Sequence, residues 1–256
     1  MRKCCQKYTG KRGEQSMEHI TSRQNALMTH IRKLNASRAY RRASGEYLCD
    51  GVKLLEEALK CNAPLKTVVL SEGVDVPALP SGVRAVRVPA DVMRSISPME
   101  TPQGALFTVA LPETKLPETL AGKHYLVLDG VQDPGNVGTI LRTADAFDCD
   151  GVFLVNACAD LFNPKTARAT MGAIFRREAY SASPEELFAL LQKSGVPLYG
   201  TALRKDTVPL ARADLSRAAV AIGSEGRGVS QAVLDASAKT VKIPMAEQCE
   251  SLNAAI

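Results

Sequence analysis

Polar and glycine-rich residues that could do chemistry gather in three short segments of the C-terminal half. These are residues 133–142 (DPGNVGTILR), 222–228 (IGSEGRG) and 243–253 (IPMAEQCESLN). Each follows or ends an apolar run, where a backbone can approach a ligand and polar side chains can be held in place. Together the three segments predict a pocket for a nucleotide-like ligand and a polar reaction.

The first segment combines a tight turn with the start of a helix. Residues 133–135 (Asp-Pro-Gly) form the turn, and Asn136 is expected to cap the helix by accepting a hydrogen bond from an unpaired N–H. The expected buried stripe of this helix is Val137, Ile140, Leu141, Ala144 and Phe147. Arg142 lies beside the stripe, where a guanidinium can bind a phosphate through two hydrogen bonds. A surface arginine on an amphipathic helix is the alternative.

The second and third segments are ambiguous when each is taken alone. Three glycines between 223 and 228 permit close approach to a flat ligand, or simply a strained turn. The Gly-Lys-Ser/Thr ending of a phosphate-binding loop is missing, and the spacing does not fit the dinucleotide fingerprint. Ser251 is expected to begin a helix as its N-cap. Convergence of all three segments on one pocket is a more specific signal than any one of them.

The elements expected around these segments define two α/β parts. After residue 123, strands are expected at 125–128, 152–155, 197–200, 219–222 and 240–243, and helices at 136–147, 165–172, 184–193 and 230–236. This alternation predicts a mostly parallel sheet, whose ligands bind beyond the carboxyl ends of the strands. Residues 21–110 predict a smaller α/β domain, with helices at 23–35 and 52–61 and strands at 67–70, 83–88 and 105–109. Two prolines make 111–122 an expected linker.

Charge is distributed unevenly along the chain. The net charge is +5, but residues 1–45 hold eleven Lys and Arg against two Asp and Glu, and the remainder holds 21 against 25. A basic N-terminal region on a mildly acidic body predicts contact with a nucleic acid. Residues 1–20 are expected to form a basic, disordered tail. Tryptophan is absent and aromatic residues make up 5%, which disfavours aromatic stacking platforms for single-stranded bases.

The cysteines and histidines do not predict a metal site. No Cys-x-x-Cys pair occurs among the seven cysteines, and the three histidines are remote from them in sequence. Free thiols in a reducing cytoplasm are therefore the simpler interpretation. No apolar run approaches the roughly 18 residues needed to cross a bilayer, so no membrane contact is expected.

The three segments taken together resemble a known family. Asn136-x-Gly-x-x-x-Arg142, residues 223–228 and residues 243–253 resemble the signature motifs of the SpoU (TrmH-type) RNA ribose 2′-O-methyltransferases, in the SPOUT superfamily. The resemblance covers about 123–256, and the domain at 21–110 is similar to the substrate-binding domain of many members. It implies a deep trefoil knot, S-adenosylmethionine as methyl donor, a homodimer through the knot domain, and ribosomal rather than transfer RNA as the substrate.

The resemblance also implies roles for individual residues. Arg142 is expected to position a phosphate and stabilise the developing alkoxide, because a guanidinium stays protonated and is a poor base. Four residues are expected to orient Arg142, the ribose and the methyl donor: Asn136, Glu225, Ser251 and Asn253. The expected cofactor pocket comprises Thr201, Ala202, Leu203, Gly223, Gly228, Ile243, Met245 and Leu252. Basic residues expected to contact RNA are Arg23, Arg38, Arg41 and Arg42.

One departure from the family pattern keeps other hypotheses open. Members continue the Ser-Leu-Asn helix for several turns, whereas this chain stops at Ile256, so a truncated C-terminal helix is expected. The alternatives are a non-catalytic RNA-binding protein with a degenerate knot and a transfer RNA 2′-O-methyltransferase. A third, an unrelated nucleotide-binding α/β protein, is weakened by the absence of either nucleotide fingerprint.

Overall fold

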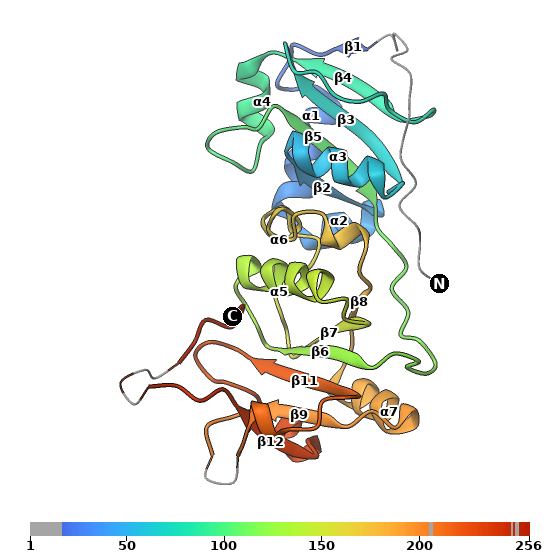
Figure 1. Cartoon of the computed structure of the whole chain (residues 1–256). Coiled ribbons are helices and arrows are strands. Elements are labelled where there is room, and N and C mark those ends of the chain that lie inside the picture. The colour runs from blue at the N-terminus through green and yellow to red at the C-terminus, as the bar shows by residue number, and fades with distance from the viewer. Residues whose placement is uncertain (1–16, 205–206, 247, 249–250) are drawn as a thin grey trace. The chain divides into compact units, whose positions relative to one another are not determined.

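The computed structural model of the chain describes residues 17–204, 207–246, 248 and 251–256 (Figure 1). The chain divides into two compact units, each built around its own sheet. The first comprises the N-terminal residues up to Pro112 together with Asp160–Arg176, and the second comprises Glu113–Ala159 and Arg177–Ile256. Of the disordered tail expected over 1–20, residues 1–16 lie outside the described residues, whereas the prediction is wrong for the rest: Glu18 and His19 form a strand and Ile20 is buried in the core. The segment 160–176 groups with the first unit, although it connects two strands of the second.

The first unit has a mixed five-stranded sheet in the order β1-β4-β3-β5-β2. Its strands are β1 (Glu18–His19), β2 (Glu46–Asp50), β3 (Leu65–Ser71), β4 (Arg84–Val88) and β5 (Ala105–Ala110). Strands β1, β4 and β3 run parallel, and β5 is antiparallel to both of its neighbours. The sheet thus begins as a parallel set and ends in antiparallel strands.

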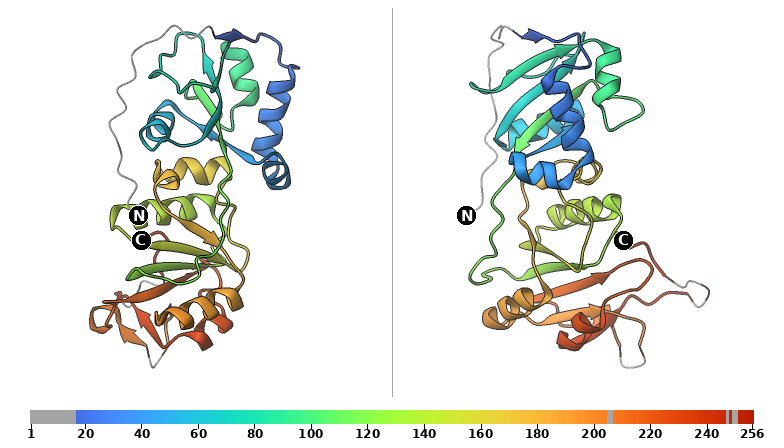
Figure 2. Two further views of the ribbon diagram at one scale, coloured as in Figure 1. Left: turned by 90° about the vertical axis from the view of Figure 1, so that its right-hand side faces the viewer. Right: turned by 180° about the vertical axis from the view of Figure 1, so that it is seen from behind.

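Helices cover both faces of this first sheet (Figure 2). They are α1 (Ala26–Ala36), α2 (Arg38–Ser44), α3 (Val52–Lys60), α4 (Ala90–Ile96) and α6 (Pro164–Ala169). Alternate residues of a strand point to opposite faces, so Val69 packs with the buried residues of α1 and α4, whereas Val68 and Leu70 pack with those of α3. Ala167 of α6 joins the α3 side of the core and is fully buried. Segment 160–176 is therefore part of this core.

The second unit has a seven-stranded sheet in the order β10-β12-β9-β11-β6-β7-β8, and every neighbouring pair is parallel. Its strands are β6 (His124–Asp129), β7 (Gly151–Val155), β8 (Ala179–Ser181), β9 (Leu198–Thr201), β10 (Val208–Pro209), β11 (Ala218–Gly223) and β12 (Lys239–Lys242). Asp129 is in register with Val155 on one side and with Gly223 on the other. The carboxyl ends of β6, β7 and β11 are therefore level, and the predicted parallel α/β fold is confirmed.

Three helices, α5 (Pro134–Ala146), α7 (Pro184–Ser194) and α8 (Gln231–Ala236), lie on the two faces of this sheet (Figures 1 and 2). Two details of α5 differ from the sequence prediction. Its N-cap is Asp133, not Asn136, and Pro134 occupies the first helical position, where a missing N–H costs nothing. Phe147 is 78% exposed rather than buried, because the helix ends at Ala146 and the C-cap residue leaves the helical periodicity.

The expected helix beginning at Ser251 is absent, since residues 251–256 form an irregular stretch with a turn at 254–255. In that turn Asn253 accepts a hydrogen bond on its side-chain oxygen from the backbone N–H of Ala255, at 2.8 Å. The backbone N–H of Ile256 donates to the carbonyl of Asn253, at 3.0 Å. Asn253 therefore closes a local turn instead of entering a helix.

Candidate active site

The start of α5 and the loop after β11 meet at the carboxyl edge of the parallel sheet. The backbone N–H of Asn136 donates to Asp133 Oδ1 at 2.9 Å, and Asn136 Nδ2 donates to Glu225 Oε1. Because Asp133 is the N-cap of the helix, the side-chain amide of Asn136 is not needed as a cap and can bind Glu225 in the loop after β11. Two predicted catalytic residues that are 89 positions apart in sequence are thereby brought into contact.

The glycine loop that carries Glu225 closes on itself. Ser224 and Gly228 exchange two backbone hydrogen bonds of 3.1 and 2.8 Å, which leaves residues 225–227 exposed at the tip. Gly228 has a φ of +68°, and a Cβ on Gly223 would lie 2.0 Å from the carbonyl carbon of Gly228. Both glycines are therefore required by the closure of the loop itself, whatever ligand it binds.

The remaining predicted catalytic residues lie outside this contact. Arg142 is exposed on α5, six residues after Asn136 and so about 9 Å further along the helix axis. Among the described residues, no hydrogen bond or ion pair joins Arg142 to Asn136 or Glu225. Ser251 and Asn253 lie in the exposed C-terminal stretch, which Figure 1 draws on the side of the sheet to which the β11 arrow points.

The predicted cofactor residues at and just beyond the ends of β9 and β12 combine hydrogen-bonded polar groups with exposed apolar residues. Thr201 Oγ1 donates to the carbonyl of Ala221 at 2.8 Å, and the N–H of Ala202 donates to the carbonyl of Val241 at 3.1 Å. Just beyond these strands, the side chains of Leu203 and Ile243 are 68% and 46% exposed. Two large apolar side chains in water beyond neighbouring strands are typical of a binding surface.

The sequence interpretation missed a buried carboxylate at the same edge. Asp129, the last residue of β6, is 2% exposed and accepts hydrogen bonds from Asn156 Nδ2 at 2.7 Å and from the backbone N–H of Ser230 at 2.6 Å. The available signal was an acidic residue directly after the apolar run 125–128. Acidic side chains are rarely buried unless they are paired, so this position indicates a structural or functional role.

Two known families match the chain. The SpoU rRNA Methylase family matches residues 123–256, and the MRM3-like substrate binding domain matches residues 25–106. The chain belongs to the SpoU rRNA methylase family. The first match contains every residue of the Asn136–Glu225 site and of the Asp129 cluster. The second lies within the first structural unit.

Individual SpoU relatives resemble the chain over nearly its whole length. RlmP of Bacillus subtilis, a 23S rRNA (guanosine(2553)-2′-O)-methyltransferase, is 32% identical over 241 residues, which cover 94% of this chain and 96% of the relative. An AdoMet-bound rRNA methyltransferase from Sinorhizobium meliloti superposes with a TM-score of 0.82 at 28% identity, covering 93% of each chain. The SpoU methyltransferase AviRb of Streptomyces viridochromogenes, bound to AdoMet, gives 0.79 at 25% identity, covering 91% and 93%.

These matches confirm the predicted family, and with it an RNA ribose 2′-O-methyltransferase that uses S-adenosylmethionine and acts on ribosomal RNA. The all-parallel sheet is consistent with the trefoil knot that the resemblance implies. The residues present fit the methyl donor, because exposed Leu203 and Ile243 offer apolar surface to a flat purine and the glycine loop leaves open space around Gly226.

A cysteine thiol near the SpoU site is structural. Cys158 Sγ donates to the carbonyl oxygens of Leu128 and Val155, at 3.1 and 3.2 Å. Burial raises the pKa of the Cys158 thiol, so it stays protonated at neutral pH and is a poor nucleophile. The described residues hold no group of three His, Cys, Asp or Glu side chains suited to a metal ion. No helix in the described ranges is both long enough and apolar enough to cross a membrane.

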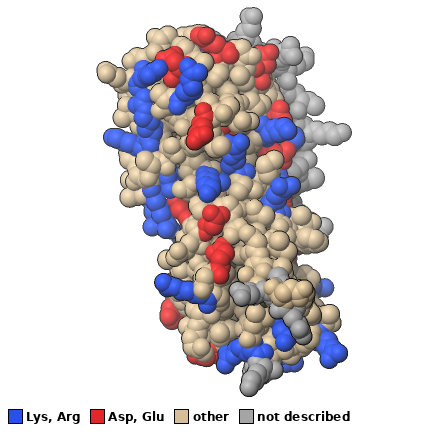
Figure 3. Space-filling model, turned by 90° about the vertical axis from the view of Figure 1, so that its left-hand side faces the viewer, with Lys and Arg blue, Asp and Glu red and all other residues tan. Residues whose placement is uncertain are grey.

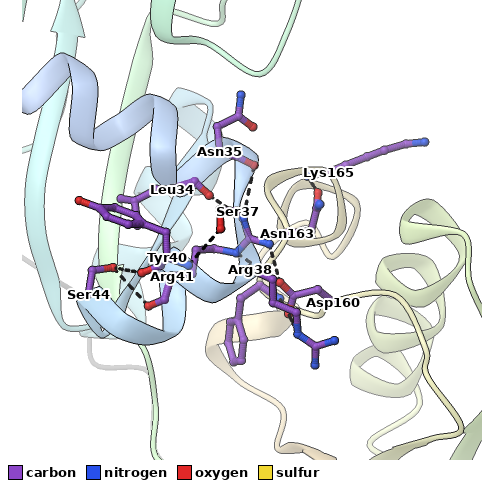
Figure 4. A network of polar contacts seen from close by, with 11 residues as sticks. Leu34, Asn35, Ser37, Arg38, Tyr40, Arg41, Ser44, Asp160, Asn163 and Lys165 are labelled. Atoms are coloured by element: carbon purple, nitrogen blue, oxygen red, sulfur yellow. Dashed lines mark hydrogen bonds and ion pairs between the residues drawn. The ribbon is translucent and has the colours of Figure 1, made fainter.

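The arginines predicted to contact RNA differ in their exposure, and Figure 4 shows the contact of one of them, Arg41, with Asp160. Arg41 is only 3% exposed, and its guanidinium donates to Asp160 Oδ2 at 2.6 and 3.2 Å and to the carbonyl of Leu34 at 2.5 Å. The prediction that Arg41 contacts RNA is therefore corrected: its burial gives it a structural role. Arg38 and Arg42 are exposed and line a shallow, open depression on α2 together with Ala39 and Ala43.

Arg23 is exposed but paired, because it donates two hydrogen bonds to Asp91 Oδ2 at 2.8 and 3.1 Å. On the face drawn in Figure 3, lysine and arginine side chains gather over the N-terminal unit, with a few acidic side chains among them. On α2, Arg38 also lies 3.7 Å from a carboxylate oxygen of Asp160, so Arg42 is the exposed α2 arginine that is more readily available to an RNA phosphate.

Proposed function

We propose that the chain transfers the methyl group of S-adenosylmethionine to a ribose 2′-hydroxyl of ribosomal RNA at a site centred on Asn136 and Glu225. The observation that carries this assignment of the site is the contact between these two side chains. It joins the first and second signature segments at the carboxyl edge of a parallel sheet, where ligands of such sheets bind.

The pair is suited to orienting a hydroxyl group. An ionised carboxylate only accepts hydrogen bonds, and the amide of Asn136 takes up one oxygen of Glu225. The other oxygen of the carboxylate can then accept from the ribose hydroxyl or from an arginine. When bound, the sulfonium of S-adenosylmethionine supplies a methyl group activated for displacement. The protein contributes most by holding the attacking oxygen in line with that methyl group.

Arg142 serves a different step in this proposal. Its guanidinium is exposed on α5 and can bind the phosphate of the target nucleotide in a bidentate manner. The same positive charge stabilises the negative charge that develops on the 2′-oxygen as its proton passes to the second oxygen of Glu225 or to water. Ser251 and Asn253 supply short polar side chains from the C-terminal stretch to the same site.

The cofactor pocket is proposed to lie beyond the carboxyl ends of β9, β11 and β12. Leu203, Ile243 and Leu252 are three of the large exposed apolar side chains of the described chain, and a purine ring would cover them. Thr201, Ala202, Gly223, Gly228 and Met245 complete the proposed pocket. RNA would bind to the N-terminal unit through Arg38 and Arg42, with Arg23 as a secondary contact.

A homodimer through the methyltransferase domain, in the cytoplasm, is part of the same proposal. Phe147 at the end of α5 is 78% exposed. A second copy would cover such apolar surface. Sedimentation of the intact protein tests this: we expect a dimer, and Phe147→Glu shifts it toward the monomer. A monomeric wild-type protein at micromolar concentration contradicts the dimer.

The decisive experiment maps 2′-O-methyl groups in ribosomal RNA from cells with and without the gene. We expect one modified ribose to be lost on deletion and restored by purified protein with S-adenosylmethionine. Asn136→Ala should fail to restore it, whereas Thr139→Ala, an exposed position on the same helix, should succeed. Identical methylation maps from the two strains would contradict the proposed function.

A further inference from the structure

A buried carboxylate links the two sides of the proposed catalytic contact. Asp129 Oδ1 accepts from Asn156 Nδ2, at 2.7 Å, and Asp129 Oδ2 accepts from the backbone N–H of Ser230, at 2.6 Å. Asn156 Nδ2 also lies 3.3 Å from Ser230 Oγ. The donors come from the turn after β7 and from the N-cap of α8, so one side chain joins the ends of three chain segments.

Asp129 holds the glycine loop at both of its ends. Gly223, where the loop leaves β11, is the register partner of Asp129 in the parallel sheet. Ser230, two residues after the loop closes at Gly228, is bound by the Asp129 carboxylate. A charge-assisted hydrogen bond to a buried carboxylate is stronger and more restrictive than a neutral one. Asp129 therefore lies beside both ends of the loop, through its backbone register at Gly223 and through its carboxylate at Ser230.

The other half of the contact starts from Asp129 as well. Four residues after it, Asp133 caps α5 and binds the backbone N–H of Asn136, at 2.9 Å. Two backbone hydrogen bonds hold the intervening chain in place. The N–H of Gly130 donates to the carbonyl of Val155 at 3.0 Å, and the N–H of Ala159 donates to the carbonyl of Val131 at 2.9 Å. The backbone between Asp129 and Asn136 therefore has little conformational freedom.

We propose that Asp129 is a positioning residue for methyl transfer, which sets the Glu225 loop against Asn136 without touching substrate or cofactor. The inference rests on the proposed role of the Asn136–Glu225 pair. The two carboxylate oxygens of Asp129 accept hydrogen bonds from two different donors, so the carboxylate itself is needed. An asparagine at this place turns an NH2 group toward one of the donors and loses that hydrogen bond.

The test measures kcat for methyl transfer from S-adenosylmethionine to ribosomal RNA extracted from cells lacking the gene. We expect Asp129→Asn to lower kcat about 100-fold, since a displacement near 1 Å at a reacting group costs about that much. Asn156→Gly serves as the second variant. Glycine tolerates the φ of +53° at this position and removes only the side-chain donor, so the fold is kept. Asn156→Gly should therefore also lower kcat.

Asp150 provides a matched control at the opposite edge of the same sheet. Its Oδ2 accepts from the backbone N–H groups of Lys123 and His124, at 2.7 and 3.0 Å. Asp150 is exposed, unlike Asp129, but Asp150→Ala removes two hydrogen bonds of similar length far from the loop, so it should leave kcat within about threefold. An equal loss of kcat in the Asp150 and Asp129 variants would mean that Asp129 acts only through stability, and it would overturn the proposal.

A double-mutant cycle separates positioning from general destabilisation. If Asp129 acts through the loop, Asp129→Asn should cost little further activity once Glu225→Gln is present, because coupled residues are not additive. Fully multiplicative losses would overturn the inference. A different result would show that the proposed Asn136–Glu225 site itself is wrong. In that case Glu225→Gln alone would retain the wild-type kcat on the same RNA.

Discussion

Arg41 and Asp160 form a buried ion pair between residues 119 positions apart, with Arg41 Nη2 2.6 Å from Asp160 Oδ2. At the other end of the same segment, Arg176 Nη1 lies 2.7 Å from Glu57 Oε2. Between these two ion pairs, the ring of Phe162 packs on Tyr47 with centroids 4.9 Å apart. Residues 160–176 are thus fastened into the N-terminal unit at both ends, although their sequence lies inside the match to the SpoU family.

Removing the Asp160 carboxylate should destabilise the N-terminal unit. Arg41 is almost fully buried, so Asp160→Asn leaves a guanidinium in the interior without its counter-ion, which costs about 3–5 kcal/mol of unfolding free energy. Urea unfolding followed by circular dichroism measures the loss. The exposed Arg84–Glu18 pair is the control, because Glu18→Gln should have little effect in the same assay. Equal unfolding midpoints for both variants contradict a structural role for Asp160.

Arg142→Ala should abolish methyl transfer while leaving the affinity for S-adenosylmethionine within about threefold. Arg142 lies on α5, whereas the apolar residues proposed to bind the purine follow other elements, so its removal should affect the RNA phosphate and the 2′-oxygen. Calorimetry with S-adenosylmethionine and a methylation assay with ribosomal RNA separate the two effects. Arg142→Lys keeps the charge and should recover only part of the rate, because an ammonium cannot bind a phosphate in a bidentate manner. Turnover retained by Arg142→Ala would remove this residue from the mechanism.

The dependence of RNA affinity on salt should report the contribution of α2. Each phosphate contact that is lost lowers the slope of log K against log salt by about 0.7–0.9. Arg42→Ala should reduce the slope by about that amount, and Arg38→Ala by less, because the Arg38 guanidinium lies 3.7 Å from Asp160 Oδ1. Arg23→Ala should reduce it less, because Arg23 is engaged by Asp91. A slope unchanged in the Arg38, Arg42 double variant places the RNA contact elsewhere on the protein.

Strands β6, β7, β9 and β11 were predictable because each is a largely buried apolar run followed by glycine or polar residues, whereas β8 and β10, with three and two residues, give no such signal and were not predicted. The Asn136–Glu225 site was predictable as residue types in a family pattern, but not as a contact. Asn136 was mistaken for the N-cap, although Pro134 at the first helical position marks Asp133 as the cap. Nothing local to Arg41 indicates its burial, since that depends on Asp160 in a distant segment. The short elements α2 and α4 have seven residues each, too few for a periodic signal.

Asp50 predicts how the stability of the N-terminal unit depends on pH. Burial raises the pKa of this carboxyl, and the hydrogen bond from Ser97 at 3.0 Å and the charge of Arg168 only partly offset that effect. A raised pKa in the folded state means that folding favours the protonated form. The corresponding contribution to unfolding free energy is complete below the ordinary pKa and is lost as pH rises through the folded value.

Asp50→Asn should therefore flatten this part of the stability profile and raise stability at neutral pH. The substituted side chain would remain uncharged at every pH, and its amide oxygen can still accept the hydrogen bond from Ser97. Unfolding by urea at a series of pH values from about 3 to 7 measures the difference between the two proteins, which should grow with pH from the ordinary carboxyl range upward. Asp91→Asn, at an exposed position whose pKa is lowered by Arg23, should shift stability in the opposite direction as pH rises. A difference between Asp50→Asn and wild type that stays constant with pH contradicts the raised pKa of Asp50.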